Sequence, residues 1–149
     1  MKKQLILVGG AMGVGKSAVC RELLRQLTPG VWLDGDWCWN MNPFVVSEEN
    51  KRMVLSNITH LLRAYLNNSS YRYVLFCWVM DQPLLFEAVL GPLRDIPFTF
   101  TAFHSSARSR LCGNGWNATY GTASGRPTSS REASGGCLPT PHCRHANWM

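Results

Sequence analysis

The stretch "LVGGAMGVGKSAVC", residues 7–20, runs from apolar residues into a glycine-rich loop that ends in a lysine and a serine. Gly10, Gly15, Lys16 and Ser17 fit the pattern G-x-x-x-x-G-K-[ST]. Glycines let successive backbone N–H groups turn inward, and a helix that starts at the loop adds the positive end of its dipole. The stretch therefore predicts a strand, a phosphate-binding loop and a helix, in that order.

The same loop predicts how a nucleotide would be held. Lys16 would reach the β- and γ-phosphates and act as a catalytic residue, and Ser17 would ligate Mg²⁺. The expected cofactors are thus ATP and Mg²⁺. The alternative is a glycine-rich turn with a chance Gly-Lys-Ser. The residues expected to surround the nucleotide are Gly10, Ala11, Met12, Gly13, Val14, Gly15, Lys16, Ser17 and Ala18.

Strand-like and helical patterns alternate along residues 1–103. Apolar runs predict strands at residues 4–8, 31–33, 71–80 and 98–103, and helical spacing predicts helices at residues 16–27, from Ser47 onward, and after Pro83. This alternation predicts an α/β fold with three layers, whose parallel sheet is connected by right-handed crossovers. The pattern breaks off after the fourth strand, so the sheet is expected to be truncated or disrupted there.

Length and composition limit the class of protein. A chain of 149 residues that is 46% hydrophobic suits one globular domain. None of its apolar runs approaches the about 20 residues that span a bilayer, so no membrane partner is expected. The six cysteines are scattered and fit free thiols, so we expect a cytoplasmic protein. The net charge of +6 is concentrated beyond residue 100 without a basic helix, which argues against a nucleic-acid partner.

The stretch "LDGDW", residues 33–37, places two carboxylates at the expected end of the second strand. Ligands of open α/β sheets bind beyond the carboxyl ends of the strands, so Asp34 and Asp36 should face the phosphate loop. One carboxylate can hold Mg²⁺ while the other accepts a proton from an attacking hydroxyl. The alternative is an Asp-Gly turn that only ends the strand.

The motifs "GGAMGVGKS" and "LDGDW" together resemble the small P-loop kinases, which include shikimate, gluconate, adenylylsulfate and nucleoside-monophosphate kinases. The stretch "LDGDWCWNMNPF" with "FCWVM" is similar to bacterial proteins described as AAA-type ATPases or nucleotide-kinase-like proteins. The resemblance covers residues 1–100. It implies that Asp34 lies near Mg²⁺, that Asp36 is the catalytic residue at the acceptor hydroxyl, and that the terminal phosphoryl group passes to an unknown small-molecule acceptor.

The stretch "WCWNMNPF", residues 37–44, is expected to lie over the acceptor. An apolar or stacking wall would be formed by Trp37, Trp39, Met41 and Phe44, and directional hydrogen bonds would come from Asn40 and Asn42. The expected acceptor site consists of Asp36, Trp37, Trp39 and Asn40. The alternative is that the aromatic residues are core between the strand and the next helix. Asp81 follows the third apolar run, where a Walker-B aspartate would lie, and the alternative is that it caps the next helix.

Residues 104–149 contain no Ile or Val and are rich in Gly, Ser, Thr and Pro. Such a segment cannot fill a core, so residues 1–103 form the expected domain and residues 104–149 a separate tail. The tail is interpreted either as disordered or as the product of a shifted reading frame. Trp116 is encoded by TGG and the codon of Asn117 begins with AA, so a frame starting on each third base reads glutamate there. Synonymous codons allow that frame to encode a charged, amphipathic helix.

The sequence therefore favours an ATP-binding P-loop protein that transfers the γ-phosphoryl group to an acceptor hydroxyl or phosphate. A second hypothesis is a nucleotide-binding or slowly hydrolysing NTPase without an acceptor, and a third is nucleic-acid binding through the basic tail. Small P-loop kinases close an arginine-bearing lid after the fourth strand. That pattern is missing here, so the activity of this chain is expected to be impaired.

Overall fold

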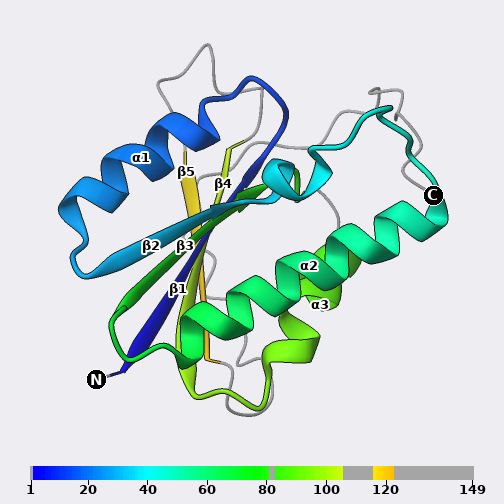
Figure 1. The fold of residues 1–149 in the computed structure, drawn as a ribbon. Coiled ribbons are helices and arrows are strands. Elements are labelled where there is room, and N and C mark those ends of the chain that lie inside the picture. Colours follow the sequence, from blue (N-terminus) through cyan, green and yellow to red (C-terminus); the bar gives the residue numbers. More distant parts are fainter. Residues whose placement is uncertain (1, 81–82, 106–115, 123–149) are drawn as a thin grey trace.

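The computed structural model describes residues 2–80, 83–105 and 116–122 (Figure 1). The elements follow one another as β1 (Lys3–Gly10), α1 (Lys16–Gln26), β2 (Gly30–Asp34), the 3₁₀ helix η1 (Gly35–Trp39), α2 (Glu48–Asn67), β3 (Tyr73–Trp78), α3 (Pro83–Leu90), the 3₁₀ helix η2 (Gly91–Leu93), β4 (Phe98–Ser105) and β5 (Trp116–Thr122). The predicted alternation of strands and helices is confirmed through β4.

The five strands form one sheet in the order β2-β3-β1-β4-β5. Strands β1 to β4 are parallel, as predicted, and β5 pairs antiparallel with β4. The parallel order therefore ends at the fourth strand. Strand β5 was not predicted, although its sequence "WNATYGT" carries the aromatic and β-branched residues that strands favour. It falls within the expected tail, as do residues 104–105 at the end of β4, and residues 106–115 and 123–149 of that tail lie outside the described residues.

The sheet is the middle layer of three (Figure 1). Helix α1 covers one face, and α2 and α3 cover the other. The larger core lies on the α2 and α3 face, where Leu5 and Leu7 of β1 are fully buried against α2. Alternate residues of β1 point to the α1 face, where Val8 packs with Cys20 and Cys77 in a smaller cluster. The two faces of the sheet are thus unequally covered by the described residues.

Helix α2 begins directly after Ser47, where the sequence predicts the start of a helix. The Ser47 hydroxyl caps it by accepting a hydrogen bond from the backbone N–H of Asn50 at 3.1 Å. Glu48 and Glu49 occupy the first turn, where the helix dipole favours negative charge. The buried stripe that packs on the sheet consists of Val54, Ile58, Leu62 and Leu66. A helix of 20 residues is therefore fixed at its start by a cap and along its length by core contacts.

Helix α1 ends at Gln26, one residue before the predicted end, because Leu27 adopts an extended backbone conformation. The apolar residues of the predicted helix are only half-buried; they are Val19, Leu23, Leu24 and Leu27. Cys20 and Lys16 are the buried residues of this helix. Helix α1 therefore packs on the sheet, as expected, with a shallower contact than α2 makes.

Candidate phosphate and acceptor site

The glycine-rich loop lies between the carboxyl end of β1 and the start of α1. Gly13 and Gly15 have φ angles of 75° and 94°, in the region that side chains with a Cβ rarely adopt. Gly15 is also the N-cap residue of α1, and among the described residues no side chain caps this helix end and no acidic residue lies in its first turn. The free N–H groups of the helix start are therefore available to an anion.

Lys16, the first residue of α1, is held over this loop. It is nearly buried, with 8% of its surface exposed, and its Nζ donates a hydrogen bond to the Ala11 carbonyl at 2.9 Å. A buried ammonium group is stable only when polar groups surround it. The loop carbonyl serves that purpose, and it keeps the positive charge at the helix start, where phosphates would bind.

Ser17 and Asp34 meet directly, although 17 positions separate them in the sequence. The Ser17 hydroxyl donates to Asp34 Oδ2 at 2.7 Å, and the backbone N–H of Asp36 donates to Asp34 Oδ1 at 3.1 Å. Asp34 is 6% exposed at the end of β2, and each of its two carboxylate oxygens accepts one of these hydrogen bonds. The carboxylate thereby sits beside the serine that the loop motif assigns to metal binding.

These oxygen atoms fit Mg²⁺. Mg²⁺ is usually held by one or two protein oxygen ligands together with substrate phosphates and waters. Ser17 Oγ and Asp34 provide this number of oxygens. In the described part of the chain no cluster of three or more His, Cys, Asp or Glu residues could hold a metal by itself. A metal at this site would therefore depend on the nucleotide phosphates for its remaining ligands.

Asp36 lies in η1, two residues beyond Asp34, and its carboxyl is accessible from solvent. Partial burial among the surrounding protein atoms raises the pKa of Asp36, and the neighbouring Asp34 carboxylate raises this pKa further. The positive charge of Lys16 and the indole of Trp78 act in the opposite direction. A carboxylate with a raised pKa is a better proton acceptor than an ordinary surface aspartate.

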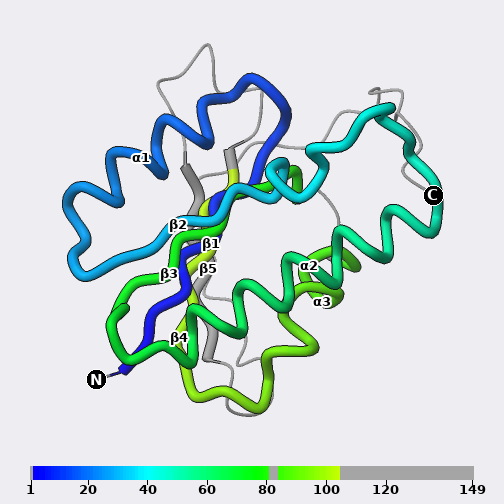
Figure 2. Tube along the Cα trace, viewed as in Figure 1, coloured from blue at the N-terminus to red at the C-terminus, as the bar shows by residue number. Residues whose placement is uncertain are grey.

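A cavity of about 930 Å³ opens beside Asp36, and we call it the acceptor pocket. Residues of η1 and of the first turns of α2 line this pocket, and Figure 2 shows the path of the chain from β2 to α2. Its lining includes all four residues of the expected acceptor site, Asp36, Trp37, Trp39 and Asn40, together with Met12 of the glycine-rich loop. The structure thus brings the second carboxylate, the aromatic residues and the loop to one cavity.

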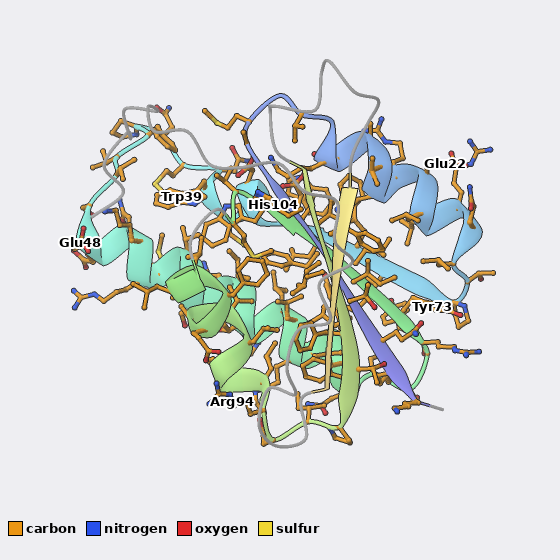
Figure 3. The ribbon with its side chains drawn as sticks, turned by 180° about the vertical axis from the view of Figure 1, so that it is seen from behind. Glu22, Trp39, Glu48, Tyr73, Arg94 and His104 are labelled. Carbon is orange, nitrogen blue, oxygen red and sulfur yellow. The ribbon has the colours of Figure 1, made fainter. Side chains whose placement is uncertain are left out.

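The two interpretations of residues 37–44 each apply to different side chains. Trp37 and Phe44 are 55% and 61% exposed and line the acceptor pocket. Met41 packs against the larger core and is absent from the described lining. Trp39 both packs against this core and lines the pocket. Figure 3 shows Trp39 on the side of the sheet where α2 carries Glu48, opposite Glu22 of α1.

Sequence reasoning missed several residues that line the acceptor pocket, among them Lys51 and Arg52 of α2 and Trp78 at the end of β3. The position of Trp78 at the carboxyl end of a parallel strand was a usable signal. Lys51 and Arg52 gave none, since charged residues near a helix start are common on any surface. Asp81, expected after β3, lies outside the described residues.

A glycine-rich loop between the first strand and helix of a parallel α/β sheet defines a nucleotide-binding P-loop protein. A family model described as an AAA domain, AAA_18, matches residues 6–104, and the chain belongs to this family. The two motifs that resemble those of small P-loop kinases, residues 9–17 and 33–37, lie within this match. In the described residues, no helix has both the length and the apolar character needed to cross a membrane.

Comparison with other proteins gives a likeness of fold. No curated protein matches the sequence significantly. A chain from the structure of the Pnkp1/Rnl/Hen1 RNA repair complex matches at 16% identity with a TM-score of 0.56, covering 70% of this chain and 33% of its own. A chain from a second structure of the Pnkp1/Rnl/Hen1 complex has 16% identity and a TM-score of 0.49, with 68% and 35% covered. The present chain thus spans about a third of the length of these neighbours.

Proposed function

We propose that this protein binds ATP with Mg²⁺ at residues 10–18 and transfers the γ-phosphoryl group to a hydroxyl of a small molecule in the acceptor pocket. The observation that carries the proposal is the arrangement of the two aspartates. Asp34 is engaged with Ser17, and Asp36 lines the acceptor pocket. A protein that only binds a nucleotide has no use for a second carboxylate beside the metal site.

The residues of the loop take the phosphate side of the reaction. Backbone N–H groups at the start of α1 bind the phosphate oxygens, and Lys16 exchanges its bond to the Ala11 carbonyl for a phosphate oxygen. Ser17 and Asp34, which are hydrogen-bonded to each other, would hold the metal. Mg²⁺, when bound, neutralises charge on the β- and γ-phosphates.

Asp36 takes the acceptor side. Its carboxylate accepts the proton of the attacking hydroxyl while the acceptor oxygen forms a bond to the γ-phosphorus. The bond from that phosphorus to the bridging oxygen breaks, and the electron pair leaves with ADP. Trp37, Trp39 and Asn40 hold the acceptor in place. Such positioning, with proton transfer, is the main contribution a protein makes to phosphoryl transfer.

Two substitutions test this proposal separately. Lys16→Ala removes the charge that contacts the phosphates, so Mg-ATP affinity measured by calorimetry should be abolished or greatly reduced in a protein that still unfolds cooperatively. Asp36→Asn keeps the shape of the side chain, so Mg-ATP affinity should change little. Arg25→Ala, on the outer surface of α1, is the control. Unchanged Mg-ATP affinity in folded Lys16→Ala would overturn nucleotide binding at this loop.

Transfer is tested by incubating the protein with γ-labelled ATP and a set of hydroxyl compounds. Label in an acceptor, lost in Asp36→Asn, supports the proposal. Release of phosphate with no labelled acceptor would favour a slow NTPase instead. The set should include an RNA oligonucleotide with a free hydroxyl end, because the fold neighbour comes from an RNA repair complex. A cytoplasmic location, where ATP and Mg²⁺ are available, is part of the proposal.

A further inference from the structure

The acceptor pocket has one wall of aromatic rings that are already fixed in position. Trp37 packs against Trp32 with ring centroids 5.0 Å apart, and Trp39 packs against Phe44 at 5.8 Å. Trp78 packs against the buried Phe76 at 6.4 Å. Trp37 and Phe44 nonetheless remain more than half exposed. Rigid aromatic surface that faces a cavity is characteristic of a site for a flat, apolar ligand group.

Within the part of the chain that the structure describes, one cation of the pocket lacks a partner. Lys51 Nζ pairs with Glu48 Oε1 at 2.8 Å, which neutralises its charge. Arg52 is exposed, and within the described residues it makes no hydrogen bond or ion pair. A guanidinium group pairs with a carboxylate or phosphate through two parallel hydrogen bonds. Arg52 is therefore free to bind an anionic group of a molecule in the pocket.

The volume and polarity of the pocket argue against a small polyol. A volume of about 930 Å³ is at the upper end of the range for small-molecule sites. Among the described lining residues, the polar side chains besides the two α2 cations are Asp36 and Asn40, and the others are apolar or aromatic. A polyol would leave most of its hydroxyl groups without partners against such walls, which costs binding energy.

We propose that the acceptor carries a planar ring and an anionic group in addition to its hydroxyl. The ring lies against Trp37 and Trp39, the hydroxyl lies at Asp36, and the anionic group pairs with Arg52. This proposal rests on the proposed function, because it assigns the substrate class of the same pocket. In the transfer step the acceptor oxygen gains the phosphoryl group from ATP, its proton passes to Asp36, and ADP leaves.

The experiment measures binding to the full chain with its nucleotide loop saturated by a nonhydrolysable ATP analogue and Mg²⁺. Three probes separate the features of the acceptor. Uridine 3′-monophosphate has ring, hydroxyl and anion; uridine lacks the anion; gluconate has hydroxyls and an anion but no ring. Affinities are measured by calorimetry and by quenching of tryptophan fluorescence. We expect uridine 3′-monophosphate to bind about tenfold or more tighter than either other probe.

Arg52→Gln should lower the affinity for uridine 3′-monophosphate to that for uridine and leave uridine affinity unchanged. Arg25→Gln, on α1 and outside the pocket, should change neither affinity. The substrate class is overturned if gluconate binds as tightly as uridine 3′-monophosphate, if Arg52→Gln preserves the preference, or if no probe binds while the ATP analogue does. Failure of the ATP analogue itself to bind would instead overturn the proposed function.

Discussion

Partial burial and neighbouring charges together shift the pKa of Asp36. Burial and the Asp34 carboxylate raise the pKa of Asp36 above its ordinary value of 3.8. The folded state therefore binds this proton more tightly than the unfolded state does. Between pH 3.8 and the raised pKa, the stabilisation that this group contributes declines as the pH rises, and at neutral pH the ionised carboxylate is a net cost.

Asp36→Asn should therefore make the protein more stable at pH 7, and this gain should shrink as the pH falls toward 3.8. Urea denaturation of both proteins at a series of pH values measures it. The same substitution should lower the rate of phosphoryl transfer by about 10²–10⁴-fold, the usual contribution of a general base. If the stability difference between the two proteins does not change with pH, the burial of Asp36 is not its cause.

Gly35 precedes Asp36 and touches the ring of Trp78. A Cβ atom at this position would lie less than 3.0 Å from three atoms of the Trp78 indole. Gly35→Ala should therefore displace Trp78 and destabilise the fold by about 1–3 kcal/mol, the usual effect of overpacking. Because Trp78 lines the acceptor pocket, acceptor binding should weaken as well.

Thermal unfolding and probe titration measure these two effects. Gly91→Ala is the matched control, because a Cβ there meets nothing within 4 Å. Equal melting temperatures for the Gly35→Ala protein and the parent would show that Trp78 moves aside without cost. That result would remove any positioning role of Gly35 in the pocket.

Helix α2 packs on the larger core and also supplies residues that line the acceptor pocket. Its start is set by the Ser47 cap, and the next turns carry Lys51 and Arg52 to the pocket wall. Ser47→Ala leaves the backbone N–H of Asn50 without its partner, so the free energy of unfolding should fall by about 0.5–2 kcal/mol.

Ser56→Ala, at an exposed position in the middle of α2, is the control. It should be neutral or slightly stabilising, because alanine is the better helix former. Chemical denaturation of both variants compares the two positions. A similar effect at the two positions would mean that the cap is not what fixes the start of α2.

Elements that depend on local patterns could be predicted from the sequence. Ser47 and the apolar spacing that follows it predict where α2 begins, and the glycines of residues 10–18 predict the phosphate-binding loop. Strand β5 was missed because its pairing partner, β4, is fixed by the sheet and not by neighbouring residues. The pocket position of Arg52 was missed for the same reason, since only packing decides which wall α2 forms.

The two faces of the sheet differ in how much apolar surface is buried on them. The face beneath α2 and α3 buries most of the core, whereas beneath α1 the buried cluster consists of Val8, Cys20 and Cys77, with Ile6 only partly buried. Helix α1 alone covers this face within the described residues. Further apolar surface buried there would add stability at about 25 cal/mol per Å².

The interpretation of residues 104–149 as the product of a shifted reading frame predicts that the intact protein covers this face more fully. Sequencing the encoding DNA would show whether that frame encodes the charged, amphipathic helix pattern. We expect a protein made with the restored frame to have a higher melting temperature, to resist trypsin better and to aggregate less, because an amphipathic helix can cover the α1 face of the sheet. We also expect it to transfer phosphate faster, because small P-loop kinases place charge-neutralising arginines after the fourth strand.

The control is the restored chain carrying Lys16→Ala, which should keep the gain in stability without the gain in activity. If the 149-residue chain already matches the restored one in melting temperature, protease resistance and transfer rate, residues 104–149 are a genuine part of the protein and the frameshift interpretation is wrong.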